Sequence, residues 1–372
     1  MKIAILTSGI LPVPAIHGGA VETLIDFYID YNNRHQLHDI TVYSTPPKIS
    51  LWIKIKRKWY SWTHQEGYYH PYIEYFLHKT IKDIRRKQYD IIILENRPAY
   101  ALRLKEITQA RLICHLHNDF LNSETPQAKE IYNNLWRIIT VSNYIKSRVQ
   151  TINAASNKCQ TINNGIDLEK FKNKKDKENT AKPRQKSAPM TIVFSGRLNK
   201  EKGIMELIEA MNRLANYSQI KLMVLGSSFY GNTDNTNEFI KTLRSKAEPL
   251  KERITFTGFI PYSDMPSYLK KADIAVIPSV WDDPFPTTVL EAQAIGLPII
   301  STHRGGIPEE VSEQNAILLD TDDFFIDNLA SAILDLYQHP EKRELMSKVS
   351  LERAKLYDKE TYARNFFKAL EP

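Results

Sequence analysis

The chain has 372 residues, enough for two domains of ordinary size. Its 42% hydrophobic and 25% charged residues are typical of a globular protein and exclude a fibrous or wholly disordered chain. The net charge of +7 is concentrated in two lysine-rich segments, 48–58 and 170–187, so it does not predict a nucleic-acid binder that uses its whole surface.

Neither a membrane span nor export is predicted. The apolar runs are four or five residues long, whereas a spanning helix needs ~18. The run at the N-terminus is too short for a signal peptide. Two cysteines, Cys114 and Cys159, cannot form a disulfide framework. We therefore expect a cytoplasmic protein.

Strand and helix patterns alternate along the chain, with one interruption. The segment 172–189 contains no large apolar residue, so it predicts a solvated linker. Before it, strands are predicted at 2–7, 40–43, 91–94, 111–116 and 138–141, and helices at 20–32 and 73–87. After it, strands are predicted at 191–195, 221–225, 254–257, 274–277, 298–301 and 316–318, and helices at 203–215, 237–250, 263–271, 287–295, 324–338 and 359–370.

This alternation predicts an α/β fold of two Rossmann-like domains, whose parallel sheets face each other across a cleft. The domains are predicted at 1–171 and 190–356, with the basic linker 172–189 between them and a C-terminal helix within 357–372 that packs back on the first domain. Ligands of such sheets bind at the carboxyl ends of the strands. The loops that follow strands should therefore carry the chemistry.

Two loops of the second half fit a bound phosphate. In S-G-R-L-N-K-E-K-G (195–203), glycines let backbone amides approach an anion that Arg197 and Lys202 would neutralise; a solvated turn is the alternative. In P-S-V-W-D-D-P-F-P-T-T-V-L-E-A (278–292), a helix begins near Pro286, and the carboxylates of Asp283 and Glu291 suit sugar or ribose hydroxyls. Simple helix capping by Asp282 and Asp283 is the alternative there.

The first half offers weaker signals. Gly18-Gly19 opens a helix in a phosphate-tolerant turn. His115 and His117 lie on one face of a strand because side chains alternate with a period of two. No third metal ligand is evident, and a pair of histidines is more often structural. The only D-x-D string, at 320–322, indicates a capping loop.

The two loop motifs of the second half, T-H-R-G-G-I-P-E at 302–309, N-G-I-D at 164–167 and the early Gly18-Gly19 follow one another in a fixed order. As a set they resemble the retaining nucleotide-sugar glycosyltransferases of family 4, which have the GT-B architecture. The resemblance covers nearly the whole chain, although the N-terminal half shares only its loops. It implies transfer of a hexose-type sugar from a nucleotide-diphosphate donor to a glycan or lipid-linked acceptor in cell-surface polysaccharide synthesis. Family frequency favours a UDP-sugar.

The resemblance also implies a role at each matching position. Arg197 and Lys202 would bind the donor diphosphate, and Glu291 would hold the ribose hydroxyls. Asp283 stands where the family has a glutamate that contacts the donor sugar, so the shorter side chain leaves the donor sugar open. His117 would lie beside that sugar. The other implied donor contacts are Gly18, Gly19, Gly196, Phe259, Pro286, Thr287 and Thr288.

Leaving-group chemistry completes this hypothesis. Breaking a glycosyl–diphosphate bond builds negative charge that Arg197, Lys202 and helix-end amides would stabilise, so no metal and no cofactor is expected. Two alternatives stay open at this point. One is a sugar-nucleotide epimerase or hydrolase on the same fold. The other is a non-catalytic binder of anionic polymers through the lysine segments.

The segment 48–62 predicts contact with an anionic membrane. It holds five cations and three tryptophans, without an acidic residue. Tryptophan with Lys or Arg suits the headgroup layer, and each cation near an anionic leaflet contributes ~1 kcal/mol. The alternative is a helix that packs its tryptophans on its own domain.

Overall fold

A computed structural model of the chain describes residues 1–371 except 17, 46–70, 156, 173–188 and 228–237. The membrane segment 48–62 and nearly all of the linker 172–189 therefore lie outside the described residues, and both stay predictions. The described chain forms two compact units. Unit 1 comprises Met1–Asn163 with Tyr362–Pro372, and unit 2 comprises Asn164–Thr361. The chain thus leaves unit 1 before position 171, where the sequence places the domain boundary.

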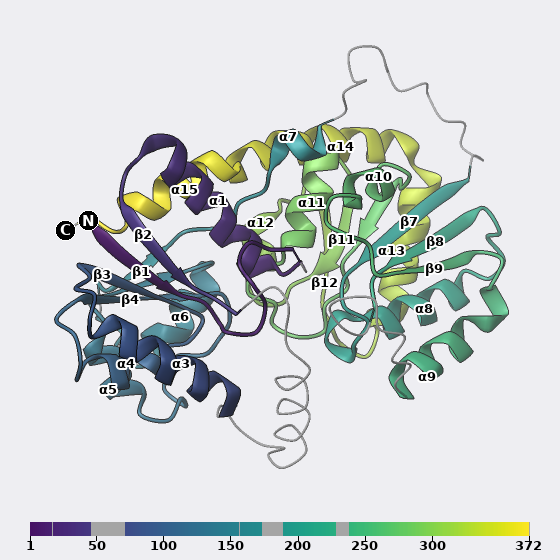
Figure 1. The fold of residues 1–372 in the computed structure, drawn as a ribbon. Helices are drawn as coiled ribbons and strands as arrows, with labels where there is room; N and C mark the ends of the chain where they lie inside the picture. The colour runs from purple at the N-terminus through teal and green to yellow at the C-terminus, as the bar shows by residue number, and fades with distance from the viewer. Residues whose placement is uncertain (17, 46–70, 156, 173–188, 228–237, 372) are drawn as a thin grey trace. The chain divides into compact units, whose positions relative to one another are not determined.

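Unit 1 is built on a six-stranded parallel sheet in the order β2-β1-β3-β4-β5-β6. Figure 1 shows α1 and α15 on one face of this sheet and α3, α4 and α5 on the other. Its strands are β1 (Lys2–Leu6), β2 (Asp39–Tyr43), β3 (Ile91–Glu95), β4 (Arg111–Leu116), β5 (Arg137–Thr140) and β6 (Cys159–Thr161). Its helices are α1 (Ala20–His35), α3 (Pro71–Ile84), α4 (Tyr100–Leu104), α5 (Ala128–Asn134), α6 (Asn143–Gln150) and α15 (Lys359–Lys368).

Unit 2 holds a second six-stranded parallel sheet, in the order β12-β11-β10-β7-β8-β9. Its strands are β7 (Met190–Ser195), β8 (Ile220–Leu225), β9 (Ile254–Gly258), β10 (Ile274–Val276), β11 (Ile299–Thr302) and β12 (Ala316–Leu319). Its helices are α7 (Leu168–Phe171), α8 (Ile204–Arg213), α9 (Glu238–Ala247), α10 (Met265–Leu269), α11 (Thr287–Ile295), α12 (Ile307–Glu310), α13 (Phe325–Gln338) and α14 (Pro340–Ala354).

Both sheets are covered on two faces, so their strands carry apolar side chains on both sides. All five residues of β3 are buried, as expected for a central strand between helices. In unit 2 one hydrophobic cluster joins β7, β8 and β10 to α8, α9 and α13. The predicted fold class of two Rossmann-like α/β domains is confirmed. None of the described helices is long and apolar enough to cross a membrane.

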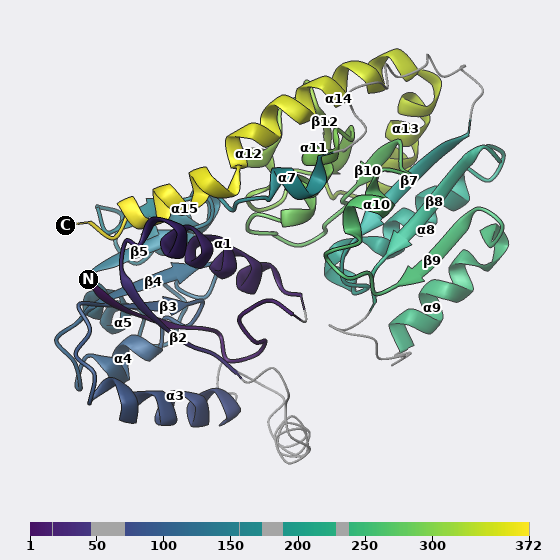
Figure 2. The same ribbon diagram turned by 45° about the horizontal axis from the view of Figure 1, so that its top comes forward.

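The last helix, α15, packs on unit 1. From Tyr362 onward its apolar residues belong to the same cluster as Leu24, Ile25 and Tyr28 of α1. The rings of Tyr28 and Phe366 stack with their centroids 4.1 Å apart. Figure 2 shows α15 running alongside α1. The C-terminal residues therefore complete the core of the N-terminal unit.

The structure contains the predicted helices and strands with ends shifted by a few residues, and it also contains elements that the sequence did not predict. The helix expected from Gly203 begins one residue later, because Gly203 is left-handed (φ 68°) and ends the preceding turn. Helix α14 was not predicted. Few of its side chains are buried, and Leu345 and Leu351 are exposed, so its sequence shows little amphipathic pattern. Strand β6 has three residues, too few for a recognisable period.

Replacing Phe366 with alanine should destabilise unit 1, because the side chain is fully buried against Tyr28. Loss of a buried phenylalanine costs about 3–5 kcal/mol, including the cavity that it leaves. Urea unfolding followed by circular dichroism would measure this. Lys368→Ala on the exposed side of the same helix is the control and should stay within about 0.5 kcal/mol. Equal effects of the two variants would show that α15 contributes no core.

Candidate active site

Each sheet has one point at which the strand order reverses, and loops meet there. In unit 2 the chain proceeds outward from β7 through β8 to β9, then returns to β10 on the other side of β7. In unit 1 the corresponding point lies between β1 and β3. Ligands of open parallel sheets bind outside the carboxyl ends of the strands at such points. The loops after β7, β10, β1 and β3 are therefore the places to examine.

Glycine allows the loop after β7 to lie against the end of β10. Gly203 adopts φ +68°, and a Cβ built on it would lie only 1.8 Å from the carbonyl oxygen of Pro278. A side chain at this position would collide with backbone, which cannot move aside. The backbone N–H of Val280 also donates to the carbonyl of Glu201 over 3.0 Å. This close approach brings Lys202 next to the loop after β10.

Lys202 forms an ion pair with Asp283 in this place. The two side chains are 19% and 6% exposed. Ser279 lies beside the same carboxylate oxygen, Oδ2, with its hydroxyl 3.4 Å away. The backbone N–H of Gly306 donates to the Asp283 carbonyl over 2.8 Å. Two residues far apart in the sequence thus meet at the reversal point of the sheet.

The capping alternative for the two aspartates is not what the structure shows. Helix α11 follows Pro286, and within the described part of the chain no side chain forms a hydrogen bond at its cap. Asp283 instead pairs with Lys202, while Asp282 lies 3.2 Å from Nε of Arg304. Both carboxylates are therefore engaged with cations, and the first amides of α11, at Thr287 and Thr288, are not bonded by a capping side chain.

Arg197 is the exposed cation of the same loop. Its side chain is 44% exposed and is 3.9 Å from the carboxylate of Glu201, a long and solvated ion pair. Gly196, just before it, is extended with positive φ (153°). Phe259 follows β9 and is half-buried. Arg197 is therefore free to reorient toward an anion at little energetic cost.

Glu291 lies on α11 in an environment that disfavours its charge. It is 6% exposed, and burial raises the pKa of its carboxyl to about 8, an effect that nearby Lys170 partly offsets. The Lys170 ammonium lies over the ring of Tyr262, 3.8 Å from its centroid. At neutral pH the Glu291 carboxyl is mostly protonated, so it both donates and accepts hydrogen bonds.

Sequence reasoning missed a second buried acid, Glu310, at the end of α12. Its residue is fully buried, and neither carboxyl oxygen has a hydrogen-bond partner among the described residues. Burial, and then the charge of Asp283, raise the pKa of Glu310 well above its usual range. Its position in a G-G-I-P-E-E string gave no sign that this acid would be buried.

In unit 1 the loop after β1 ends in two glycines with positive φ, Gly18 at 75° and Gly19 at 109°. A Cβ on Gly19 would lie 2.2 Å from a carboxyl oxygen of Glu22, in the first turn of α1. Burial raises the pKa of Glu22 to about 7, and the charge of Glu95 adds to the effect. The loop therefore presents a buried acid that is close to half-protonated at neutral pH.

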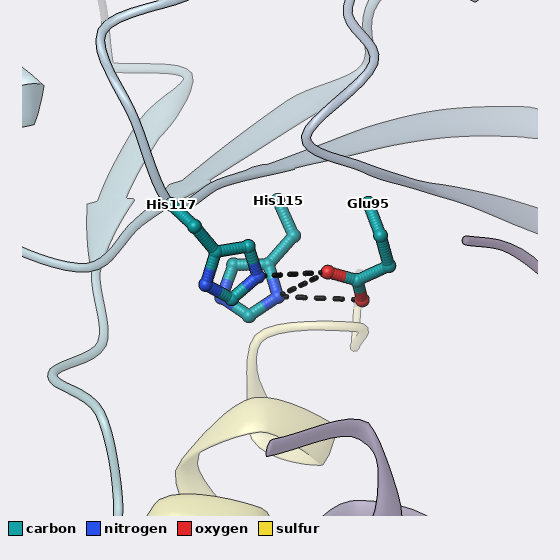
Figure 3. Close-up of side chains that lie close together, drawn as sticks. All are labelled: Glu95, His115 and His117. Carbon is teal, nitrogen blue, oxygen red and sulfur yellow. Dashed lines mark hydrogen bonds and ion pairs between the residues drawn. The ribbon is translucent and has the colours of Figure 1, made fainter. Parts of the chain in front are cut away.

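His117 follows β4 and contacts Glu95, the last residue of β3, as Figure 3 shows. Its Nε2 lies 2.9 Å from Oε2 of Glu95, and Nδ1 of His115 lies 3.1 Å from the same oxygen. The hydroxyl of Tyr28 donates to Oε1 over 2.8 Å. The two imidazoles are neighbours, with ring centroids 4.1 Å apart. The predicted placement of both histidines on one face is confirmed.

Glu95 supplies the third potential metal ligand that the sequence did not reveal. One ligand atom from each of Glu95, His115 and His117 falls within 4.8 Å of the others. Metal-binding histidines nearly always donate their second ring nitrogen to another group. Here Nε2 of His115 and Nδ1 of His117 have no partner among the described residues. Hydrogen bonding around one carboxylate explains the cluster better than a metal does.

The structure thus brings the predicted residues into two groups. Lys202 and Asp283 touch in unit 2, and Arg197 and Gly196 share their loop; Glu291 lies on the helix that follows Asp283. His117 belongs to unit 1, as do Gly18 and Gly19. An acid at the end of an apolar strand, as in I-I-I-L-E, was the signal that could have identified Glu95.

Two family sequence models match nearly all of the chain. The family described as Glycosyltransferase Family 4 matches residues 18–170, and the one described as Glycosyl transferases group 1 matches residues 175–353. These two ranges correspond closely to the two Rossmann-like halves.

Curated proteins and solved structures agree with these matches. A putative glycosyltransferase, YtcC of Bacillus subtilis, is 29% identical over 84% of this chain and 78% of its own. The lipopolysaccharide 1,2-N-acetylglucosaminetransferase of Salmonella typhimurium is 26% identical over 69% of this chain and 65% of its own. The crystal structure of Anabaena HepE in complex with UDP-glucose has the same fold, with a TM-score of 0.72 at 21% identity, and covers 100% of this chain and 99% of its own.

Glu291→Gln should make the protein less sensitive to alkaline pH. The pKa of Glu291 rises from 4.5 to about 8 on folding, so its contribution to stability is full below about pH 4.5 and is lost as the pH rises to 8. The loss is at most on the order of 5 kcal/mol. Thermal unfolding at pH 5 and pH 8.5 should show similar stability at the lower pH and a more stable variant at the higher one. The exposed Glu313→Gln is the control, and parallel pH profiles for Glu291→Gln and wild type would contradict the assignment.

Proposed function

Because the chain is a GT-B glycosyltransferase of the family 4 type, we propose that it transfers a hexose from a UDP-sugar to a glycan or lipid-linked acceptor of a cell-surface polysaccharide, with retention of the anomeric configuration. The observation that carries this proposal is the Lys202–Asp283 pair at the reversal point of the second sheet, with Arg197 exposed in the same loop. Two cations in one loop, which lies against the segment that leads into a nine-residue helix, suit a diphosphate.

The donor would be held through its phosphates, its ribose and its base. Arg197 and Lys202 would pair with the diphosphate, assisted by the amides of Thr287 and Thr288 at the start of α11. Glu291 would bond the ribose hydroxyls. The half-buried Phe259 lies after β9, a place that suits the base. In unit 1, Gly18 and Gly19 would approach the diphosphate, while His117 would contact the sugar.

Catalysis would rest on stabilising the leaving diphosphate. Negative charge grows on the bridging oxygen as the glycosyl bond breaks, and fixed cations there lower the barrier more than they strengthen ground-state binding. Asp283 holds the Lys202 ammonium in place and, through its second oxygen, would reach the sugar. Neither a bound metal nor a cofactor takes part in this scheme.

Relatives support the choice of donor and acceptor. The HepE structure holds UDP-glucose, which favours a UDP-hexose here. The Salmonella relative is named for adding a sugar to lipopolysaccharide, which favours a surface glycan as acceptor. An epimerase or hydrolase on the same fold is distinguished by its products, since it would convert or cleave the donor without an acceptor.

A UDP-hexose should stabilise the protein against thermal unfolding and be consumed in the presence of an acceptor glycan. Binding to the folded state adds ~2.7 kcal/mol at a hundredfold excess over Kd. Arg197→Ala should lower turnover by about 10²–10³ while the fold survives, because the side chain is exposed. Lys202→Ala should do the same, although it also leaves the buried Asp283 unpaired. Lys200→Ala, an exposed lysine in the same turn, is the control. Wild-type rates in both test variants would refute the phosphate assignment.

Turnover should persist in excess EDTA. The charge on the leaving diphosphate is met by Arg197 and Lys202, so chelation of divalent ions removes nothing that the reaction needs. Initial rates with and without EDTA, on protein dialysed against the chelator, provide the measurement. Loss of activity that magnesium or manganese restores would show that a metal carries the charge instead.

A further inference from the structure

The carboxylate of Glu95 is the common acceptor of three buried hydrogen bonds. A carboxylate has no proton to give, so Tyr28, His115 and His117 must each donate to it. Burial alone would raise the pKa of Glu95, but the two imidazoles hold it well below its usual range, so the group is ionised. The negative charge of Glu95 therefore fixes which ring nitrogen of each histidine carries hydrogen.

For His117 this determines a single tautomer. Nε2, 2.9 Å from Glu95, carries the hydrogen, and Nδ1 keeps its lone pair. Burial, and then the charge of His115, lower the pKa of His117 to about 4, so the ring is neutral at physiological pH. Nδ1 is buried and has no hydrogen-bond partner among the described residues. A buried acceptor without a partner is costly, and a ligand hydroxyl would satisfy it.

We propose that Glu95 is a positioning residue, which locks His117 in the Nε2–H tautomer so that Nδ1 accepts a hydrogen bond from a hydroxyl of the bound sugar. This inference rests on the proposed function, since the hydroxyl belongs to the sugar of the donor. His117 is then a fixed acceptor and not a proton donor. Protonating Nδ1, or turning the ring over, would remove the acceptor.

Backbone contacts hold both partners in register. Glu95 pairs directly with His115 across β3 and β4. Asn96, the next residue, adopts φ 58°, and its side-chain oxygen accepts the backbone N–H groups of His117 and Asn118, each over 3.2 Å. The end of β4 is therefore tied to the end of β3. Glu95 and His117 cannot drift apart without breaking these bonds.

Among the described residues, four further titratable groups feel the charge of Glu95, and all four are acids that contribute no positive charge. Glu22 and Tyr28 come from α1, Tyr362 from α15 and Cys114 from β4; each feels the charge of Glu95. Burial and that charge raise the pKa of Glu22, Tyr28, Tyr362 and Cys114. None of these four groups replaces His117 as the hydrogen-bond donor to Oε2 of Glu95.

The direct test is the tautomer of His117, read by NMR in the full chain labelled with ¹⁵N-histidine. Its signals are identified by their loss in His117→Asn. In the wild type we expect a protonated Nε2 and an unprotonated Nδ1, unchanged between about pH 5.5 and 8. A wild-type ring protonated on Nδ1 would overturn the proposal without any variant. So would stoichiometric zinc in the purified protein, because a metal would then occupy the cluster.

Glu95→Gln tests the consequence for the reaction. Its neutral amide accepts at most two hydrogen bonds, both at one oxygen, and its NH₂ group then faces a former donor, so it no longer accepts from all three partners of the carboxylate. We expect mixed His117 tautomers and ~10- to 100-fold slower consumption of UDP-hexose. Free UDP, which lacks the sugar, should bind with unchanged affinity. Glu106→Gln, the same change at an exposed site of unit 1, should alter nothing.

The outcomes separate this proposal from the proposed function. A Glu95→Gln variant that keeps both the single tautomer and the wild-type rate would refute positioning by Glu95. A variant that also loses UDP affinity would indicate a general loss of structure and contradict a specific role. If the wild type consumes no nucleotide sugar, the proposed function fails; a single Nε2–H tautomer that becomes mixed in Glu95→Gln would still support positioning of the ring by Glu95.

Discussion

The reversal of strand order in each parallel sheet is the constraint on which both candidate groups depend. At the reversal points, between β7 and β10 and between β1 and β3, the two neighbouring strands continue into separate loops. Side chains from these two loops can meet outside the carboxyl ends of the strands. In unit 2 Gly203 allows this contact, because it has no side chain and the loop after β7 can lie against the backbone of Pro278. Lys202 and Asp283 meet as a result. In unit 1, Glu95 ends β3, one of the two strands at the reversal point, but its histidine partners come from the end of β4 on the other side.

The fold was largely predictable because buried parallel strands leave a strong apolar signature and the glycine-rich loops between strands and helices are distinctive. The helix that the sequence did not predict, α14, has a weak amphipathic pattern, since its Leu345 and Leu351 are exposed. The site was predictable at the level of loops. Contacts between them were not, because no local rule indicates that Lys202 would lie against Asp283, or that Glu95 would reach across to His117. Such contacts depend on strand order, which sequence periodicity does not contain.

Three buried glutamates, Glu95 in unit 1 and Glu291 and Glu310 in unit 2, differ in charge state for a common reason. Among the described residues, nearby cations only partly offset the cost of burying Glu291 and Glu310, so protonation is favoured. Glu95 is equally buried, yet three donors stabilise its charge. The number of donors that each carboxyl faces, and not burial itself, decides whether it is an acceptor or a neutral acid. A neutral Glu291 can therefore both donate and accept hydrogen bonds, whereas a charged Glu95 only accepts them.

The Lys202–Asp283 pair also gives a physical reason for an aspartate at position 283, where the family resemblance leads us to expect a glutamate. A buried ion pair adds little net stability, because removing both charges from water offsets their attraction. Its value lies in fixing the ammonium at a defined point. The shorter aspartate, with Ser279 beside Oδ2 and its own carbonyl bonded to Gly306, has little freedom to swing outward. Position 283 in this chain is thus committed first to Lys202, and under the proposed function only its second oxygen would remain for the donor sugar. Donor selectivity should accordingly depend on the shape of this loop more than on the reach of one carboxylate.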